Sequence, residues 1–255
     1  MPIAVVPTLE AMAGIYSLDR DGGARSPRFA AYTALAARAW GVSEYNPMTD
    51  AAIGTVAQLR GMQAEAVVQK PAEAVLEACE ADVFTVTLAV VVASGGLWTE
   101  KLLTEVHHAV RADRRRWHGL VRTWAQEPVP IPVLAGIARA ETVRVLWHAS
   151  QGPSASLASL VAREGLAGAM ATEVADDDDL PGLDALAAAR ADSTDIGTIA
   201  AFLFGDDVAK ALGWAPLGVP LNGGQRWAMA RALGASRRIG YAAAVRSAPA
   251  EVLGL

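Results

Sequence analysis

The residues with the most obvious chemistry are the four histidines, His107, His108, His118 and His148. Imidazole binds transition metals and moves protons near neutral pH. The first three are expected on one helix, from Glu100 to Gln126, where a rise of about 1.5 Å per residue puts His107 roughly 16 Å from His118. One ion cannot bridge that gap, the motif HExxH does not occur in the chain, and the single ExxH pair, Glu105 with His108, supplies only two ligands. The sequence therefore predicts no tightly held metal, and a site completed by several helices is left open.

His148 is the candidate for acid–base catalysis. It is expected near the end of a helix over 133–150, beside Ser150 and Gln151. The helix dipole there favours the protonated imidazole and would poise it near neutral pH, so that it could serve as a general acid or base. The alternative is a structural imidazole that binds the last carbonyl groups of the helix.

Two polar segments ahead of helix starts are candidates for binding a small anion. Arg25 and Arg28 flank the pair 26–27, a serine and a proline that are typical of an N-cap and a first helical position. Tyr45 and Asn46 precede the next helix in the same way. Helix N-termini carry free N–H groups, and guanidinium forks bind carboxylates and phosphates. These four residues are the predicted substrate-binding residues, and ordinary turn and cap chemistry is the alternative explanation.

No motif in the chain indicates a particular reaction or cofactor. The patterns G-x-S-x-G, G-x-x-x-x-G-K-[ST] and a strand followed by G-x-G-x-x-G are absent. The aspartate run 176–179 lacks the spacing of a calcium loop. The single cysteine, Cys79, is expected to be a buried and unreactive thiol with a raised pKa. The cofactor stays unknown, and whether the protein is an enzyme stays open.

Composition limits the classes of partner. The net charge of -5 gives no electrostatic footprint for nucleic acid. The apolar block 83–93 is shorter than the roughly 20 residues of a membrane-spanning helix, so no membrane partner is expected. One cysteine and no recognisable signal peptide favour a cytoplasmic location. Seven tryptophans could line a pocket or an interface, which leaves a homo-oligomer open.

Residues that typically start or end helices divide most of the chain into helical segments. Three prolines, at 128, 130 and 132, indicate an extended linker. We expect a single domain over 1–255, with a possible internal boundary at this linker. The expected helices cover 26–40, 47–69, 71–93, 100–126, 133–150, 154–175, 183–191, 194–204, 206–212 and 225–246.

The stretch 71–93 is expected to be a central buried helix. Its apolar residues from Val75 through Val86 to Val90 follow three- and four-residue steps, and the stretch is long for a strand. The β-branched composition of 83–92 would also suit a buried strand, as would that of 3–6. Because the stretch is longer than a typical strand, we predict a helix. The predicted fold is therefore all-α, a compact multi-helix domain wrapped around residues 71–93.

The expected function is a cytoplasmic small-molecule binding protein, or an enzyme of unknown reaction, with its pocket at helix ends. The ligand is expected to be anionic because the candidate residues Arg25 and Arg28 stand at a helix start. The alternative is a helical interaction module, or a subunit of a larger assembly, without chemistry of its own.

Overall fold

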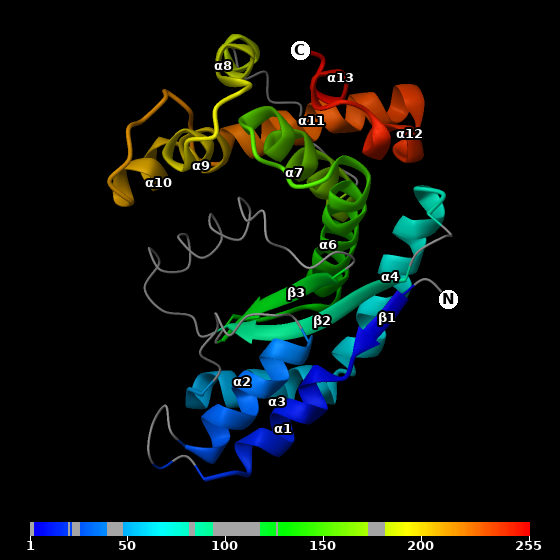
Figure 1. Ribbon diagram of the computed structural model, residues 1–255, viewed down its shortest axis with the longest axis vertical. Coiled ribbons are helices and arrows are strands. Elements are labelled where there is room, and N and C mark those ends of the chain that lie inside the picture. Colours follow the sequence, from blue (N-terminus) through cyan, green and yellow to red (C-terminus); the bar gives the residue numbers. More distant parts are fainter. Residues whose placement is uncertain are drawn as a thin grey trace.

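The computed structural model describes residues 3–19, 21, 26–39, 48–81, 85–93, 118–125, 127–172 and 182–255. Within these residues the chain forms three strands and twelve helices (Figure 1). The protein is thus a mixed α/β structure, and the all-α prediction is wrong. The labels of Figure 1 are used below.

The strands form one parallel sheet in the order β1-β2-β3. Their bounds are β1 Ile3–Val6, β2 Val86–Ala93 and β3 His118–Trp124. In the register, Val5 lies beside Leu88 and Leu88 lies beside Gly119. Every residue of β2 except Thr87 is buried, as expected for the middle strand of a parallel sheet covered on both faces.

The predicted central helix over 71–93 is a helix followed by a strand. Helix α4, Ala64–Ala78, contains Pro71 in its interior, and β2 takes up the β-branched run. A strand buried on both faces reads as a continuous apolar run rather than as alternation. Helical spacing can always be picked out of such a run, so the three- and four-residue steps had no discriminating power. The burial of Val86 and Val90 is confirmed, but in a strand.

The predicted helix over 100–126 is also wrong for its last part, which is β3. Residues 94–117 lie outside the described residues. Along β3 half-buried and buried residues alternate, with Gly119, Val121 and Thr123 on the buried side. His118 therefore lies on a strand, and its helical spacing from His107 does not apply.

Two of the three N-terminal helices begin close to their predicted starts and end earlier, and the first, over residues 8–16, was not predicted. Helices α1 Thr8–Tyr16, α2 Pro27–Ala39 and α3 Asp50–Gly61 lie below the sheet in Figure 1. Ser26 is confirmed as an N-cap, because its hydroxyl group accepts a hydrogen bond from the N–H of Phe29 at 3.2 Å. Thr49 caps the start of α3 in the same way, accepting from the N–H of Ala52 at 3.2 Å. The single helix predicted over 47–69 is divided by Gln63, whose backbone is left-handed with φ of 53°.

Helix α6, Ile131–Gln151, joins the sheet to the C-terminal helices. It packs on β3, α4 and α7, and rises above the sheet in Figure 1. The remaining helices are α7 Leu157–Thr172, α8 Leu183–Arg190, α9 Ile196–Phe204, α10 Asp206–Ala211, α11 Gly223–Ile239, α12 Tyr241–Arg246 and α13 Pro249–Leu253. They match the predicted helices closely, except that Gly240, at φ of 82°, divides the helix predicted over 225–246. No helix in the described part of the chain is both long and apolar enough to cross a membrane.

Helix α7 is the centre of the C-terminal half, and α11 lies across it at very short range. A Cβ atom on Gly165 would stand 2.4 Å from the carbonyl oxygen of Ala228 on α11. Backbone atoms cannot move aside as the end of a side chain can. A glycine is therefore required at this crossing.

The crossing predicts opposite effects for two glycine substitutions. Gly165→Ala should lose at least about 1–3 kcal/mol of unfolding free energy through overpacking. Gly234→Ala, on α11, meets no atom within 4 Å and should gain up to about 1 kcal/mol from helix propensity. Urea unfolding of both variants checks this. Equal midpoints for the two would contradict the close packing of α7 on α11.

Candidate functional site

A surface hollow of about 680 Å³ lies just beyond the carboxyl end of β1. Three helix ends surround it, the starts of α1 and α4 and the end of α3. Its lining residues are Leu9, Glu10, Ala57, Arg60, Gly61, Gln63, Ala64, Glu65 and Ala66. Ligands of parallel α/β proteins often sit beyond the carboxyl ends of strands, at a reversal of strand order. The three described strands show no reversal, so here the helices shape the hollow.

A carboxylate from α4 fixes the start of α1. The residue before α1 is Pro7, whose side chain cannot cap the helix. Glu65 takes over this role, because its Oε1 accepts a hydrogen bond of 2.8 Å from the backbone N–H of Leu9. The negative charge also suits the positive end of the helix dipole. The buried Thr8 donates its hydroxyl proton to the carbonyl oxygen of Val90 at 2.6 Å, which ties α1 to the middle strand.

The rim of the hollow carries an exposed ion pair. Both Nε and Nη2 of Arg60 donate to Oε2 of Glu10, at 3.0 and 2.6 Å. The side chains are 42% and 73% exposed. Pairs this exposed typically contribute about 0.2–1 kcal/mol, because water screens them and both side chains lose entropy. Arg60 is therefore placed to hold a carboxylate and holds its present one weakly.

The described residues that line the hollow offer charged groups for binding. They include no histidine, cysteine, serine or tyrosine. Their charged groups are one guanidinium, of Arg60, and two carboxylates, of Glu10 and Glu65. These groups can orient a charged small molecule.

Of the predicted anion-binding residues, the structure describes Arg28 alone; Arg25, Tyr45 and Asn46 lie outside the described residues. Arg28 donates from Nη2 to the carbonyl oxygens of Tyr16 at 2.6 Å and Leu18 at 2.8 Å, and from Nε to Leu18 at 3.1 Å. Its guanidinium thus closes the C-terminal end of α1, whereas the hollow lies at the N-terminal end. Among the described residues, its contacts are those of a structural cap.

His148 lies in the last turn of α6, as predicted, and is half-buried. This helix end is docked on the end of α12. Ser150 donates to the carbonyl oxygen of Val245 at 3.0 Å, and Gln151 donates to that of Ser247 at 3.2 Å. The structure does not bring His148 to the hollow, and a catalytic role for it stays a prediction.

Cys79 ends α4 as a buried thiol. Burial raises its pKa to about 11, against a smaller lowering by Arg246. The expected unreactive character is therefore supported. Its carbonyl oxygen accepts a hydrogen bond of 3.0 Å from Nη2 of Arg246, which joins α12 to the end of α4.

The described residues contain no group of three or more His, Cys, Asp or Glu side chains that could hold a metal ion. His107 and His108 lie outside them, so the expectation of no metal remains a prediction.

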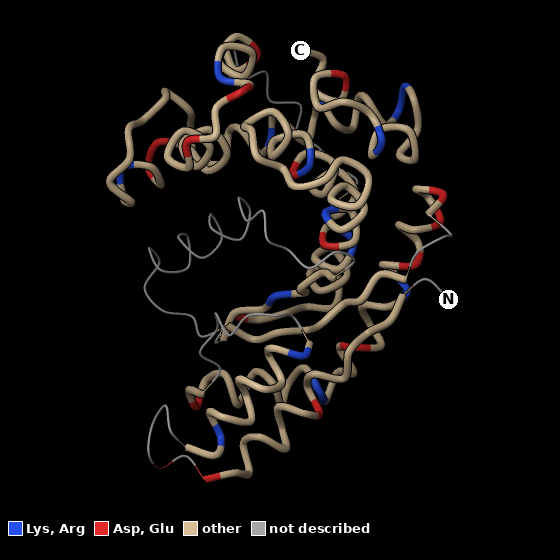
Figure 2. The backbone as a smooth tube through the Cα atoms, in the orientation of Figure 1, with Lys and Arg blue, Asp and Glu red and all other residues tan. Residues whose placement is uncertain are grey.

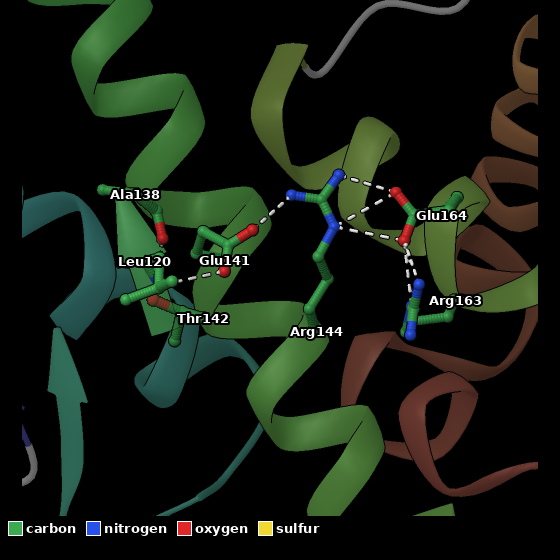
Figure 3. A network of polar contacts seen from close by, with 7 residues as sticks. All are labelled: Leu120, Ala138, Glu141, Thr142, Arg144, Arg163 and Glu164. Carbon is green, nitrogen blue, oxygen red and sulfur yellow. Dashed lines mark hydrogen bonds and ion pairs between the residues drawn. The ribbon is translucent and has the colours of Figure 1, made fainter. Parts of the chain in front are cut away.

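A buried network of charges, which the sequence analysis missed, links α6 and α7 (Figure 3). Arg144 lies between two carboxylates, 2.7 Å from Glu141 and 2.6 Å from Glu164. Glu164 also pairs with Arg163 at 2.8 Å. Burial alone would lower the pKa of Arg144, but the two carboxylates outweigh it and hold that pKa above its usual range. Opposite charges are visible side by side midway along α6 in Figure 2.

The same network reaches the sheet. Oε2 of Glu141 accepts a hydrogen bond of 3.1 Å from the backbone N–H of Leu120 in β3. Gly119 permits this approach, because a Cβ there would stand 3.2 Å from Val145 of α6. The sequence signal was a glutamate and an arginine three residues apart in a largely apolar helix. Because all its charges are paired and little exposed, the network has a structural role.

Comparisons with known proteins give no relative for this chain: no family model, no curated protein and no solved structure matches it. Function must therefore be inferred from the residues themselves.

Replacing Arg28 separates its structural role from a binding role. Arg28→Ala should lower the free energy of unfolding by about 1–3 kcal/mol, because it removes hydrogen bonds from a charged donor to two carbonyl groups. Stabilisation by carboxylates and phosphates in a thermal-shift panel should be the same as in the wild type. Loss of that stabilisation in a folded Arg28→Ala protein would instead restore Arg28 as a binding residue.

Proposed function

We propose that the protein binds a small molecule with an acid group in the hollow between α1, α3 and α4. The observation that supports this most is the Arg60–Glu10 pair, in which a guanidinium at the rim already holds a carboxylate through two nitrogens. A ligand carboxylate or phosphate would take the place of Glu10 on Arg60. Arginine suits this role because its fork of donors matches the oxygens of such groups.

The exchange costs little because Glu10 gives up a weak contact. It is exposed and returns to water when displaced. Arg60, in contrast, is held at the end of α3, next to the turn that starts α4. The ligand therefore meets a cation in the last turn of α3 whose present partner is easily replaced.

The dimensions and lining agree with a binding site. Small-molecule sites typically have volumes of about 300–1,000 Å³, and the hollow falls within that range. The charged lining groups support binding of a charged small molecule. A cytoplasmic location belongs to the same proposal, on the grounds of the cysteine content given above.

No described feature favours the interaction-module alternative to the same degree. The exposed large apolar residues are Leu18, Ile131, Val133, Leu221 and Leu255, which come from four separate places in the chain. Single exposed apolar side chains are ordinary on soluble surfaces. The four described tryptophans are buried or half-buried.

Three variants test the proposal against a panel of acetate, succinate, inorganic phosphate and methylamine, followed by amide chemical shifts. Acids should shift the amides of Leu9 and Ala66. Arg60→Gln should abolish those shifts. Glu10→Gln should strengthen acid binding up to about fivefold, because it removes a competitor worth about 0.2–1 kcal/mol.

Arg231→Gln is the matched control. Arg231 forms an equally exposed pair with Asp184, at 41% and 60% exposure, on helices that do not line the hollow. Acid binding should be unchanged in this variant. Equal loss in Arg60→Gln and Arg231→Gln, or no acid binding in the wild type, would contradict the proposal.

A further inference from the structure

We infer that the ligand of the hollow is amphoteric, a small amino acid whose acid group binds Arg60 and whose ammonium group binds Glu65. This inference rests on the proposed function and adds the ligand's second charged group. Its basis is the arrangement of the three charged side chains that line the hollow, Glu10, Arg60 and Glu65.

Charge balance is the first reason. The lining residues carry two carboxylates and one guanidinium, so the hollow has a net negative charge before any ligand enters. A simple acid on Arg60 would displace Glu10 and would then share the hollow with the carboxylate of Glu65. Like charges repel, so the carboxylate of Glu65 disfavours a second negative group in the hollow. An ammonium group on the same ligand removes this penalty.

The geometry of Glu65 is the second reason. Its Oε1 is held by the N–H of Leu9, so the carboxylate is fixed at the wall of the hollow. Its Oε2 has no hydrogen-bond partner among the described residues, and the side chain is half-buried. An ammonium group has three donors and no acceptor, which fits an oriented carboxylate oxygen.

Glu10 adds a second acceptor once the ligand's acid group has taken Arg60. Its carboxylate starts from the rim of the same hollow, in the first turn of α1. The ammonium group would then be shared between a fixed carboxylate and a mobile one. Neither a plain amine nor a plain acid uses both halves of this arrangement.

The alternative is that Glu65 serves the fold alone, as the cap of α1. Glu65→Gln distinguishes the two roles, because the amide oxygen of glutamine still accepts the N–H of Leu9 while the negative charge is gone. The fold should therefore be retained, and only a charge-dependent contact should be lost.

The experiment compares propionate, alanine, β-alanine, 4-aminobutyrate and propylamine by amide chemical-shift titration at pH 7. In the wild type at least one amino acid should bind fivefold or more tightly than both propionate and propylamine. In Glu65→Gln this advantage should disappear, while propionate binds as well as before or better.

Amino acids that bind no better than propionate to the wild type would overturn the inference and leave the acid site on Arg60 intact. An advantage that survives Glu65→Gln would overturn it as well, since another group would then bind the ammonium. Absence of binding by every compound would remove the proposed function and this inference together. The wild-type comparison stands even where the variant fails to fold.

Discussion

The buried pairing of Arg144 with Glu141 and Glu164 is the interaction on which the arrangement of the two halves depends. A charge taken out of water costs several kcal/mol unless a partner is positioned to meet it. Here the side chains are 23%, 3% and 8% exposed, so α6 and α7 must lie in one particular register to pair them. Glu141 also accepts the N–H of Leu120, which places α6 along β3 and covers donors at that side of the sheet.

The walls of the hollow are held in place by elements that pack on α6. Helix α6 packs on α4, and α4 presents Glu65 to the start of α1. Thr8 then ties α1 to β2. Because each of these contacts involves a buried or half-buried group, the walls are fixed while the exposed Arg60–Glu10 pair at the rim can exchange. The site thus combines a fixed carboxylate with a replaceable one.

The sequence predicts the C-terminal half well and the N-terminal half poorly, for a physical reason. Caps and breakers such as Asp195 and Gly205 act locally, so α9 could be placed from its neighbours in the chain. The strand β2 is defined by partners distant in sequence, and its continuous apolar run has no period of its own. The hollow depends on the contact between Arg60 and Glu10, which are fifty residues apart in the sequence. No local sequence pattern predicts that contact. Arg28 was identified as a functional arginine by its position at a helix start, yet its contacts follow from the fold around the end of α1.

The most direct measurement is the unfolding free energy of Arg144→Met beside that of Arg231→Met. Arg144→Met removes an ion-pair partner from both Glu141 and Glu164 in a buried setting, so the loss should be about 3–5 kcal/mol. Arg231→Met removes an exposed pair and should cost less than about 1 kcal/mol. Losses for the two variants that agree within about 1 kcal/mol would contradict the central role of the buried pairing.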